Sequence, residues 1–178
     1  MKSIVITGAS QRLGLTMVGQ FLSQGWNVIA LTRSPSEALT ALDDSGALSI
    51  MSLGDYSESN IQKAIEEISE KNQRIDALIH NASVFHMDQN EFSSEDFHAF
   101  FLLHMAIPAQ LNVGLQKCLY DENAPGSIIH ITDIYSENPN PKFALYCSTK
   151  AGAENLMKGY AKKFAPGIRV NSIQPGPI

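Results

Sequence analysis

The sequence predicts a single-domain α/β fold over residues 1–178, in which a doubly wound parallel sheet is covered by helices on both faces. Short apolar runs rich in β-branched residues alternate with helical stretches along the chain, as is typical of such sheets. A length of 178 residues suffices for one domain with a sizeable core. Neither an internal repeat nor a low-complexity tract nor a linker divides the sequence.

Each expected strand is a short apolar run, and each expected helix carries apolar residues at helical spacing. The strands are expected at residues 4–6, 27–31, 48–51, 77–79, 127–132 and 168–173. The first helix begins near Leu13 and stops at Gly25, and further helices are expected at residues 61–68, 94–119 and 144–164. Because sheets of this kind bind ligands beyond the carboxyl ends of their strands, we expect the functional residues there.

The composition excludes several classes of function. Hydrophobic residues make up 44% of the chain and charged residues 17%, which is usual for a soluble globular protein. A formal net charge of −5, without a dense Lys/Arg block, argues against a nucleic-acid partner or an anionic membrane surface. No apolar run approaches the roughly 20 residues of a membrane helix. Cys118 and Cys147 lack metal-ligand spacing, which favours ordinary thiols, no metal site and a cytoplasmic location.

A glycine loop follows the first expected strand and opens a helix. It contains Gly8, Ser10, Arg12, Leu13 and Gly14. Glycines let the backbone approach a pyrophosphate, and the helix N-terminus offers unpaired N–H groups. No Gly-Lys-Ser/Thr follows, so the loop is not a P-loop. The context predicts a dinucleotide site, and the alternative is a strand–helix turn that needs glycine for its geometry.

The end of the second strand predicts NADP(H) rather than NAD(H) as the cofactor. In NAD-selective sites an acidic residue there binds the ribose 2′-hydroxyl, whereas an arginine favours a 2′-phosphate. Here the residues are Arg33 and Ser34, and Arg12 adds a second cation from the glycine loop. The alternative for Arg33 is a solvated surface charge.

Polar and small residues follow the next two strands. Asp55 follows the third strand, where its carboxylate could accept a hydrogen bond from the adenine amine or cap the turn before Ser57. Asn81, Ala82 and Ser83 follow the fourth strand. Their small size would let the backbone lie against the cofactor; alternatively, they form a polar turn.

Tyr146 and Lys150 stand at positions i and i+4 near a helix start, so they share a face. Asp133 lies at the end of the preceding strand. A nearby ammonium favours tyrosinate and lowers the phenol's pKa from about 10, which suits a general acid. An exposed helical pair is the alternative for these two residues taken alone.

This set of residues resembles the short-chain dehydrogenase/reductase family over the whole chain. The matching residues are Thr7, Gly8, Asn81, Ala82, Tyr146, Lys150, Asn171, Pro175 and Gly176. The resemblance implies a Rossmann-type fold, a catalytic Tyr146, and a Lys150 that holds the nicotinamide ribose and lowers the tyrosine pKa. It also places Pro175 and Gly176 at the cofactor.

Three departures from the family pattern resemble its pteridine reductase branch, which includes bacterial dihydromonapterin reductases. Arg12 replaces the middle glycine, Asp133 the catalytic serine, and Ser83 the glycine of Asn-Ala-Gly. In that branch the arginine contacts cofactor phosphate or substrate, the serine lies near the pterin, and the aspartate works with the tyrosine in proton delivery. Phe85 falls where an aromatic ring stacks on the pterin, although core packing explains it equally well.

A fourth departure places His104 where the family has a catalytic asparagine. It shares a helix face, expected to point inward, with Phe97, Phe100, Phe101, Ile107 and Leu111. Pro108 cannot donate to the carbonyl of residue 104, which leaves that oxygen able to hold a water that relays protons toward Lys150. His104 could thus replace the asparagine, or it could be a satisfied core histidine.

The sequence therefore predicts an NADPH-dependent reductase that delivers hydride to a C=N bond of a dihydropterin, with Tyr146 as proton donor. The alternatives are a carbonyl reductase of the same family and a non-catalytic NADPH-binding regulatory protein. By resemblance, helices 94–119 and 144–164 would form a homodimer or homotetramer. The same resemblance leads us to expect that the substrate-covering loop and last strand, which would follow Gly176, are absent from this chain.

Overall fold

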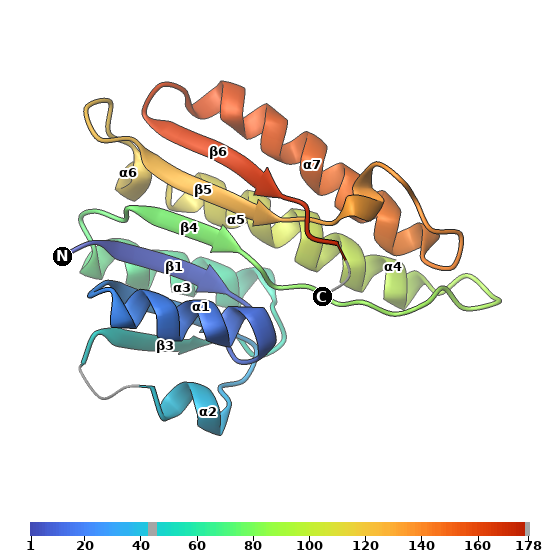
Figure 1. Ribbon diagram of the computed structural model, residues 1–178, viewed down its shortest axis with the longest axis horizontal. Coiled ribbons are helices and arrows are strands. Elements are labelled where there is room, and N and C mark those ends of the chain that lie inside the picture. Colours follow the sequence, from blue (N-terminus) through green and yellow to red (C-terminus); the bar gives the residue numbers. More distant parts are fainter. Residues whose placement is uncertain (43–45, 177–178) are drawn as a thin grey trace.

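The computed structural model describes residues 1–42 and 46–176, and these residues form an α/β fold around a six-stranded parallel sheet (Figure 1). The sheet has the order β3-β2-β1-β4-β5-β6. Its strands are β1 (Ser3–Thr7), β2 (Asn27–Thr32), β3 (Leu48–Ser52), β4 (Ala77–His80), β5 (Gly126–Ile131) and β6 (Ile168–Ile173). The predicted doubly wound fold is confirmed. The order reverses between β1 and β4, so a crevice is expected beyond their carboxyl ends.

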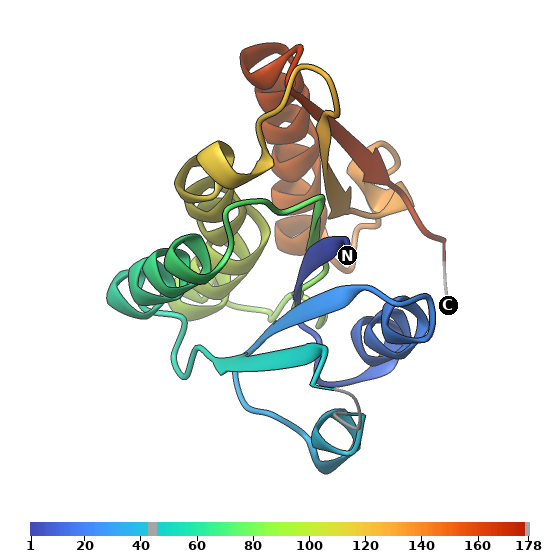
Figure 2. The same cartoon turned by 90° about the vertical axis from the view of Figure 1, so that its left-hand side faces the viewer.

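The helices cover both faces of the sheet (Figure 2). They are α1 (Arg12–Ser23), α2 (Glu37–Thr40), α3 (Glu58–Lys71), α4 (Ser94–Phe101), α5 (Ile107–Gly114), α6 (Gln116–Leu119) and α7 (Ala144–Phe164). None of the described helices combines the length and apolarity needed to cross a membrane. The predicted bounds of α7 and β6 are confirmed to the residue.

Strand alternation divides the core between the two faces. Ile4 and Ile6 pack with Val18 of α1 on one face, whereas Val5 between them packs with residues of α3, α5 and α7 on the other. Successive side chains of a strand point to opposite faces, so a strand buried on both sides is apolar throughout. This explains why β1 shows no polar alternation in the sequence.

The prediction of one continuous helix over residues 94–119 is wrong. A π-helical turn (Leu102–Ala106) separates α4 from α5, and α6 follows after Leu115. Pro108 has no N–H, so the regular α-helical bond to the carbonyl of residue 104 cannot form, and the chain accommodates this with a wider turn. His104 lies within this turn.

The prediction that Phe97 and Phe101 point inward is also wrong. Phe100 is fully buried, but Phe97 and Phe101 are 41% and 42% exposed. Figure 1 shows α4 beyond the carboxyl ends of the strands, where Phe100 packs against Tyr146 and Cys147 of α7, so only one side of α4 is covered. His104, in contrast, points inward as predicted, with 3% of its surface exposed.

Candidate active site

A crevice of about 720 Å³ lies at the carboxyl ends of β1, β2 and β4. Its lining includes Gly8, Ser10, Arg12, Leu13, Gly14, Arg33, Ser34, Asn81, Ala82, Ser83 and Phe85. These residues come from three separate loops, which the sheet topology brings together. The volume lies within the range of small-molecule and cofactor sites.

The glycine loop is held against the segment after β4. The Asn81 side-chain nitrogen donates to the carbonyl oxygens of Thr7 and Gly8 at 3.2 and 3.1 Å. Gly8 has a φ of +65°, and a Cβ on Gly14 would lie 2.1 Å from the Gly8 carbonyl oxygen. Both glycines are therefore required for the turn itself, and the same close packing leaves the backbone bare toward the crevice.

Arg12 occupies a strained backbone conformation at the start of α1. Its φ is +48°, in the left-handed region that non-glycine residues seldom adopt. Arg12, Arg33 and Ser34 all line the crevice, so two guanidinium groups and a hydroxyl are available on that side. Such strain persists only where the surroundings enforce it, and it clusters at functional sites.

Asp55 forms a cap in this structure. Its Oδ1 accepts hydrogen bonds from the backbone N–H of Ser57 at 2.9 Å and from the Asn60 side chain at 3.0 Å. The bond from Ser57 is the main cause that holds the pKa of this exposed carboxyl below its usual value. The next residue, Tyr56, lines the crevice, whereas Asp55 is not among the lining residues. The adenine contact stays a prediction.

Tyr146 and Asp133 meet directly. The Tyr146 hydroxyl donates to Oδ2 of Asp133 at 2.8 Å, and Oδ1 accepts from the backbone N–H of Tyr135 at 2.9 Å. Burial raises the pKa of Tyr146 above its usual value, and the hydrogen bond and charge of Asp133 act in the same direction. The net direction is opposite to the lowering expected from Lys150, whose charge is not among the causes of this shift.

Lys150 is almost completely buried beside this pair. Its Nζ donates to the carbonyl oxygen of Ile131 at 3.1 Å and lies 5.6 Å from the centre of the Tyr146 ring. Burial lowers the pKa of Lys150 to about 8, while the charge of Asp133 opposes the shift. The side chains of Tyr146, Lys150 and Asp133 therefore converge as predicted. The pKa of Lys150 lies close enough to neutral pH for this amine to exchange its proton.

His104 connects the loop after β4 to α7. Its Nδ1 lies 2.8 Å from Oγ1 of Thr149, and its Nε2 lies 2.8 Å from Oγ of Ser83. The Thr149 hydroxyl already donates to the Tyr146 carbonyl at 2.9 Å, so it accepts from Nδ1–H. Nε2 of the neutral ring then accepts from the Ser83 hydroxyl, whose oxygen also lies 3.2 Å from the Val84 carbonyl oxygen. Burial lowers the pKa of His104 to about 2, and the charge of Lys150 adds to this effect, so the ring is neutral.

The sequence analysis missed Thr149. A signal was available, because Thr149 follows Tyr146 by three residues and so lies on nearly the same face of α7. However, nothing in the sequence shows that this face meets a histidine from the π-helical turn. The contact depends on how α7 packs on that turn.

Phe85 lies at the mouth of the crevice, outside the core. It is 58% exposed, stacks on Phe143 with 4.6 Å between ring centres, and meets the Tyr146 ring edge-on at 4.9 Å. Core packing is therefore excluded as its role. An exposed flat ring beside the phenol can receive a planar heterocycle.

Pro175 and Gly176 lie beside the loop that carries Asp133. The Pro175 carbonyl accepts from the backbone N–H of Ile134 at 3.2 Å, and Gly176 lies close to the Ile134 side chain. Neither residue is among those that line the crevice. Their contact with the cofactor stays a prediction.

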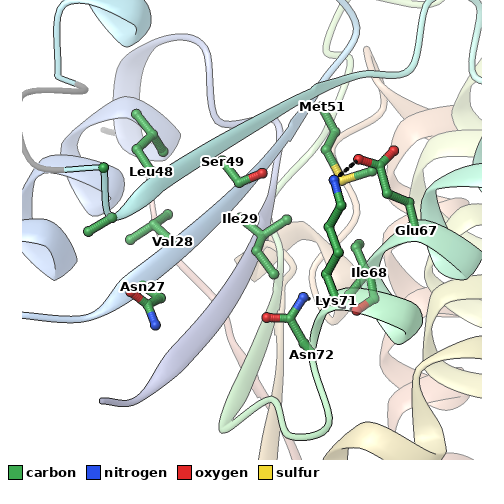
Figure 3. Close-up of a pocket in the computed structure, with 12 residues that line it drawn as sticks. Asn27, Val28, Ile29, Leu48, Ser49, Met51, Glu67, Ile68, Lys71 and Asn72 are labelled. Atoms are coloured by element: carbon green, nitrogen blue, oxygen red, sulfur yellow. Dashed lines mark hydrogen bonds and ion pairs between the residues drawn. The ribbon is translucent and has the colours of Figure 1, made fainter.

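A second hollow, of about 190 Å³, lies at the opposite ends of β2 and β3, beside α3 (Figure 3). Lys71 forms an ion pair with Glu67 at 2.6 Å, one helical turn away, and both side chains are largely exposed. Exposed ion pairs of this kind contribute little to the free energy of folding. We therefore assign no function to this hollow.

Comparison with known proteins agrees with this fold. Residues 2–178 match the family model described as short chain dehydrogenase. The chain belongs to this family. It is thus an oxidoreductase. Among curated relatives, dihydromonapterin reductase from Klebsiella pneumoniae is 33% identical over 180 residues, which covers 99% of this chain and 74% of that protein. The enzyme of the same name from Escherichia coli K12 is 31% identical, covering 98% and 73%.

Solved structures show the same architecture for this short-chain dehydrogenase. A short-chain dehydrogenase from Streptomyces avermitilis superposes with a TM-score of 0.90 at 28% identity, covering 99% of this chain and 66% of that one. The present chain thus spans about two thirds of that protein. L-sorbose reductase from Gluconobacter frateurii, solved with NADPH and L-sorbose, gives a TM-score of 0.88 at 24% identity, covers 98% of this chain and 69% of that one, and supports the fold alone.

Proposed function

We propose that this short-chain dehydrogenase uses NADPH to reduce the C=N bond of a dihydropterin, with Tyr146 as proton donor. The observation that carries the proposal is the 2.8 Å hydrogen bond between the Tyr146 hydroxyl and Asp133, beside an exposed Phe85. A pterin is flat and carries an amino-pyrimidine edge, so an aromatic ring and a carboxylate suit it. The curated relatives named dihydromonapterin reductase support the same substrate class.

The crevice residues fit a dinucleotide phosphate. Gly8 and Gly14 leave the loop backbone bare, and the amides at the start of α1 favour a pyrophosphate. Arg12, Arg33 and Ser34 would hold the 2′-phosphate that distinguishes NADPH from NADH. When bound, the cofactor supplies the hydride.

The polypeptide supplies the rest of the cofactor site. Asn81, Ala82 and Ser83 would lie along the cofactor, and Lys150 would hold the nicotinamide ribose. The protonated phenol of Tyr146 would then deliver its proton to the nitrogen of the reduced C=N bond. Because the pKa of Tyr146 is raised, the phenol holds this proton throughout the neutral range. Lys150, whose pKa is about 8, would return a proton afterwards.

An NADPH oxidation assay with a substrate panel tests the proposal. Dihydromonapterin, dihydrobiopterin and dihydrofolate are compared with a set of simple ketones, each with NADPH and with NADH. We expect turnover with a dihydropterin and NADPH, and little with ketones. Turnover restricted to ketones would assign the protein to carbonyl reduction instead, and comparable dissociation constants for the two cofactors would remove the NADP assignment.

We also propose a cytoplasmic homodimer or homotetramer. Phe97, Phe101 and Val113 expose apolar surface on α4 and α5, and a second copy would cover it. The buried cysteines Cys118 and Cys147 suit a reducing compartment. Light scattering on the wild type and on Phe101→Asp tests the assembly, because a charge at the interface should produce monomers. A monomeric wild type would exclude this assembly.

A further inference from the structure

Two buried histidines lie side by side behind the active site. His80 on β4 and His130 on β5 are 5% and 2% exposed, and their ring centres are 4.5 Å apart. Asn112 on α5, fully buried, joins them: its Oδ1 lies 2.7 Å from Nε2 of His80, and its Nδ2 lies 3.4 Å from Nε2 of His130. The mechanism proposed above uses none of these three residues.

The hydrogen bonds determine which nitrogen of His80 carries the proton. An amide oxygen only accepts, so Nε2 of His80 must donate to Asn112, and Nδ1 is left with a bare lone pair. Burial lowers the pKa of His80 to about 4, so the ring is neutral. Within residues 1–42 and 46–176, Nδ1 has no hydrogen-bond partner. A buried acceptor in this state costs free energy unless a water satisfies it.

A small cavity is lined by both His80 and Lys150. It measures about 10 Å³ and is lined by His80, His104, Pro108, His130 and Lys150 among others. This volume is about that of one water position. The Lys150 ammonium has three N–H donors, of which one is used on the Ile131 carbonyl. Pro108 leaves the carbonyl of His104 without its regular helical donor.

We propose that this cavity holds one water molecule, which accepts a hydrogen bond from Nζ of Lys150 and donates one to Nδ1 of His80. The second hydrogen of the water can reach the His104 carbonyl. His80 is then a positioning residue for Lys150, and Asn112 fixes the tautomer that makes this possible. The inference rests on the proposed function only for the importance of Lys150.

A water that accepts from the ammonium stabilises the charged form of Lys150 and so raises its pKa against the effect of burial. The other titratable or charged groups around Lys150 are Asp133 after β5, Tyr146 on α7, His104 in the π-helical turn, His130 on β5, and Glu154 one turn further along α7. The histidines among them are neutral, so the groups that favour the ammonium are the water and the two carboxylates, of which Asp133 is the one whose charge opposes the effect of burial on the Lys150 pKa.

Two substitutions of His80 separate this role from a purely structural one. In His80→Asn the amide oxygen lies near the position of Nδ1, so the acceptor for the water is kept and the contact with Asn112 is lost. In His80→Gln the amide nitrogen lies near the position of Nε2, so the donor to Asn112 is kept and the acceptor for the water is lost. The pair thus removes the two contacts one at a time.

The test is an NMR titration of ¹⁵N-labelled lysine side chains in the protein without cofactor, with the Lys150 signal assigned from Lys150→Met. We expect His80→Gln to lower the pKa of Lys150 by about half a unit to one unit, and His80→Asn to leave it nearly unchanged. An unchanged value in His80→Gln, or a shift confined to His80→Asn, would overturn the proposal. This result does not depend on turnover, so a failed pterin assay leaves it intact.

A second measurement needs no substitution of His80. A crystal structure of the unaltered protein, at a resolution that shows ordered waters, should contain a water within hydrogen-bond distance of both Nδ1 of His80 and Nζ of Lys150. A dry cavity, or a water that contacts only one of the two atoms, would contradict the proposal even if the His80 variants do not fold.

Discussion

The hydroxyl of Tyr146 donates to the carboxylate of Asp133 at 2.8 Å, although α7 carries the tyrosine and the loop after β5 carries the aspartate. The backbone N–H of Tyr135 holds the other carboxylate oxygen at 2.9 Å, so the acceptor is fixed in place before any ligand arrives. In a buried setting, this arrangement keeps the phenol protonated. It therefore favours a tyrosine that gives up a proton only when charge develops on the substrate.

Tyr146→Phe should lower turnover by about 10²- to 10⁴-fold, the usual contribution of a positioned general acid. NADPH affinity should stay near the wild-type value, because the ring and its packing remain. NADPH oxidation and a fluorescence titration of NADPH measure the two effects. Tyr160→Phe is the matched control on the same helix, since the one hydrogen bond of its hydroxyl within the described residues is to the Ala109 carbonyl, at 3.5 Å. Equal turnover in both variants would remove the acid assignment.

Lys150→Met should be more stable than the wild type at neutral pH. Burial lowers the pKa of Lys150 from 10.5 to about 8, and this shift corresponds to a cost on the order of 3 kcal/mol. Below pH 8 the lysine is charged in the folded and unfolded states alike, so the full cost applies. Between about pH 8 and 10.5 the unfolded state binds more protons, and wild-type stability rises with pH.

The stability gap between Lys150→Met and the wild type should therefore shrink as the pH rises above 8. Urea unfolding of both proteins at neutral pH and above pH 9 measures it, and the other titrating groups cancel because they are common to both. A gap that is independent of pH would show that Lys150 is not charged at a cost in the folded protein.

Arg12→Gly should raise stability and weaken NADPH binding together. Glycine adopts a φ of +48° without strain, which favours the variant by about 1 kcal/mol. Loss of the guanidinium should reduce NADPH affinity about tenfold or more, as for a charge-assisted hydrogen bond, and leave NADH affinity unchanged. Thermal melts and dissociation constants for both cofactors test this. Arg33→Ala should weaken NADPH binding with no gain in stability, because nothing indicates strain at that residue.

Gly14→Ala should destabilise the protein and disrupt the cofactor site. The added Cβ would lie 2.1 Å from the Gly8 carbonyl oxygen, so the loop must move, at a cost of about 1 to 3 kcal/mol. Gly19→Ala on the same helix is the control, because among the described residues its Cβ would meet only the Leu42 side chain, at 3.9 Å. That variant should be stabilised by up to about 1 kcal/mol. A similar result for both variants would mean that the loop is not tightly packed.

Local sequence patterns predicted most of the strands and helices of this protein and several residues of its candidate active site. The apolar runs and helical periodicities predicted the strand set, and the bounds of α7 and β6 agree to the residue. The positions of Tyr146, Lys150 and Asp133 relative to strand and helix ends predicted their convergence, because parallel strands end at one edge of the sheet. The local signal failed in the helix over 94–119, where one proline and its packing produced a π-helical turn.

Other features depend on contacts between segments that are remote along the chain. The sequence by itself determined the α/β class, the glycine turn and the spacing of Tyr146 and Lys150, since these follow from steric limits and periodicity within a few residues. Only the tertiary structure decided that Asp55 caps a turn, that burial and the Asp133 carboxylate raise the pKa of the phenol, and that Nδ1 of His80 has no partner among the described residues. Hydrogen bonding and desolvation depend on which segments, remote along the chain, pack together, and a linear pattern does not contain that information.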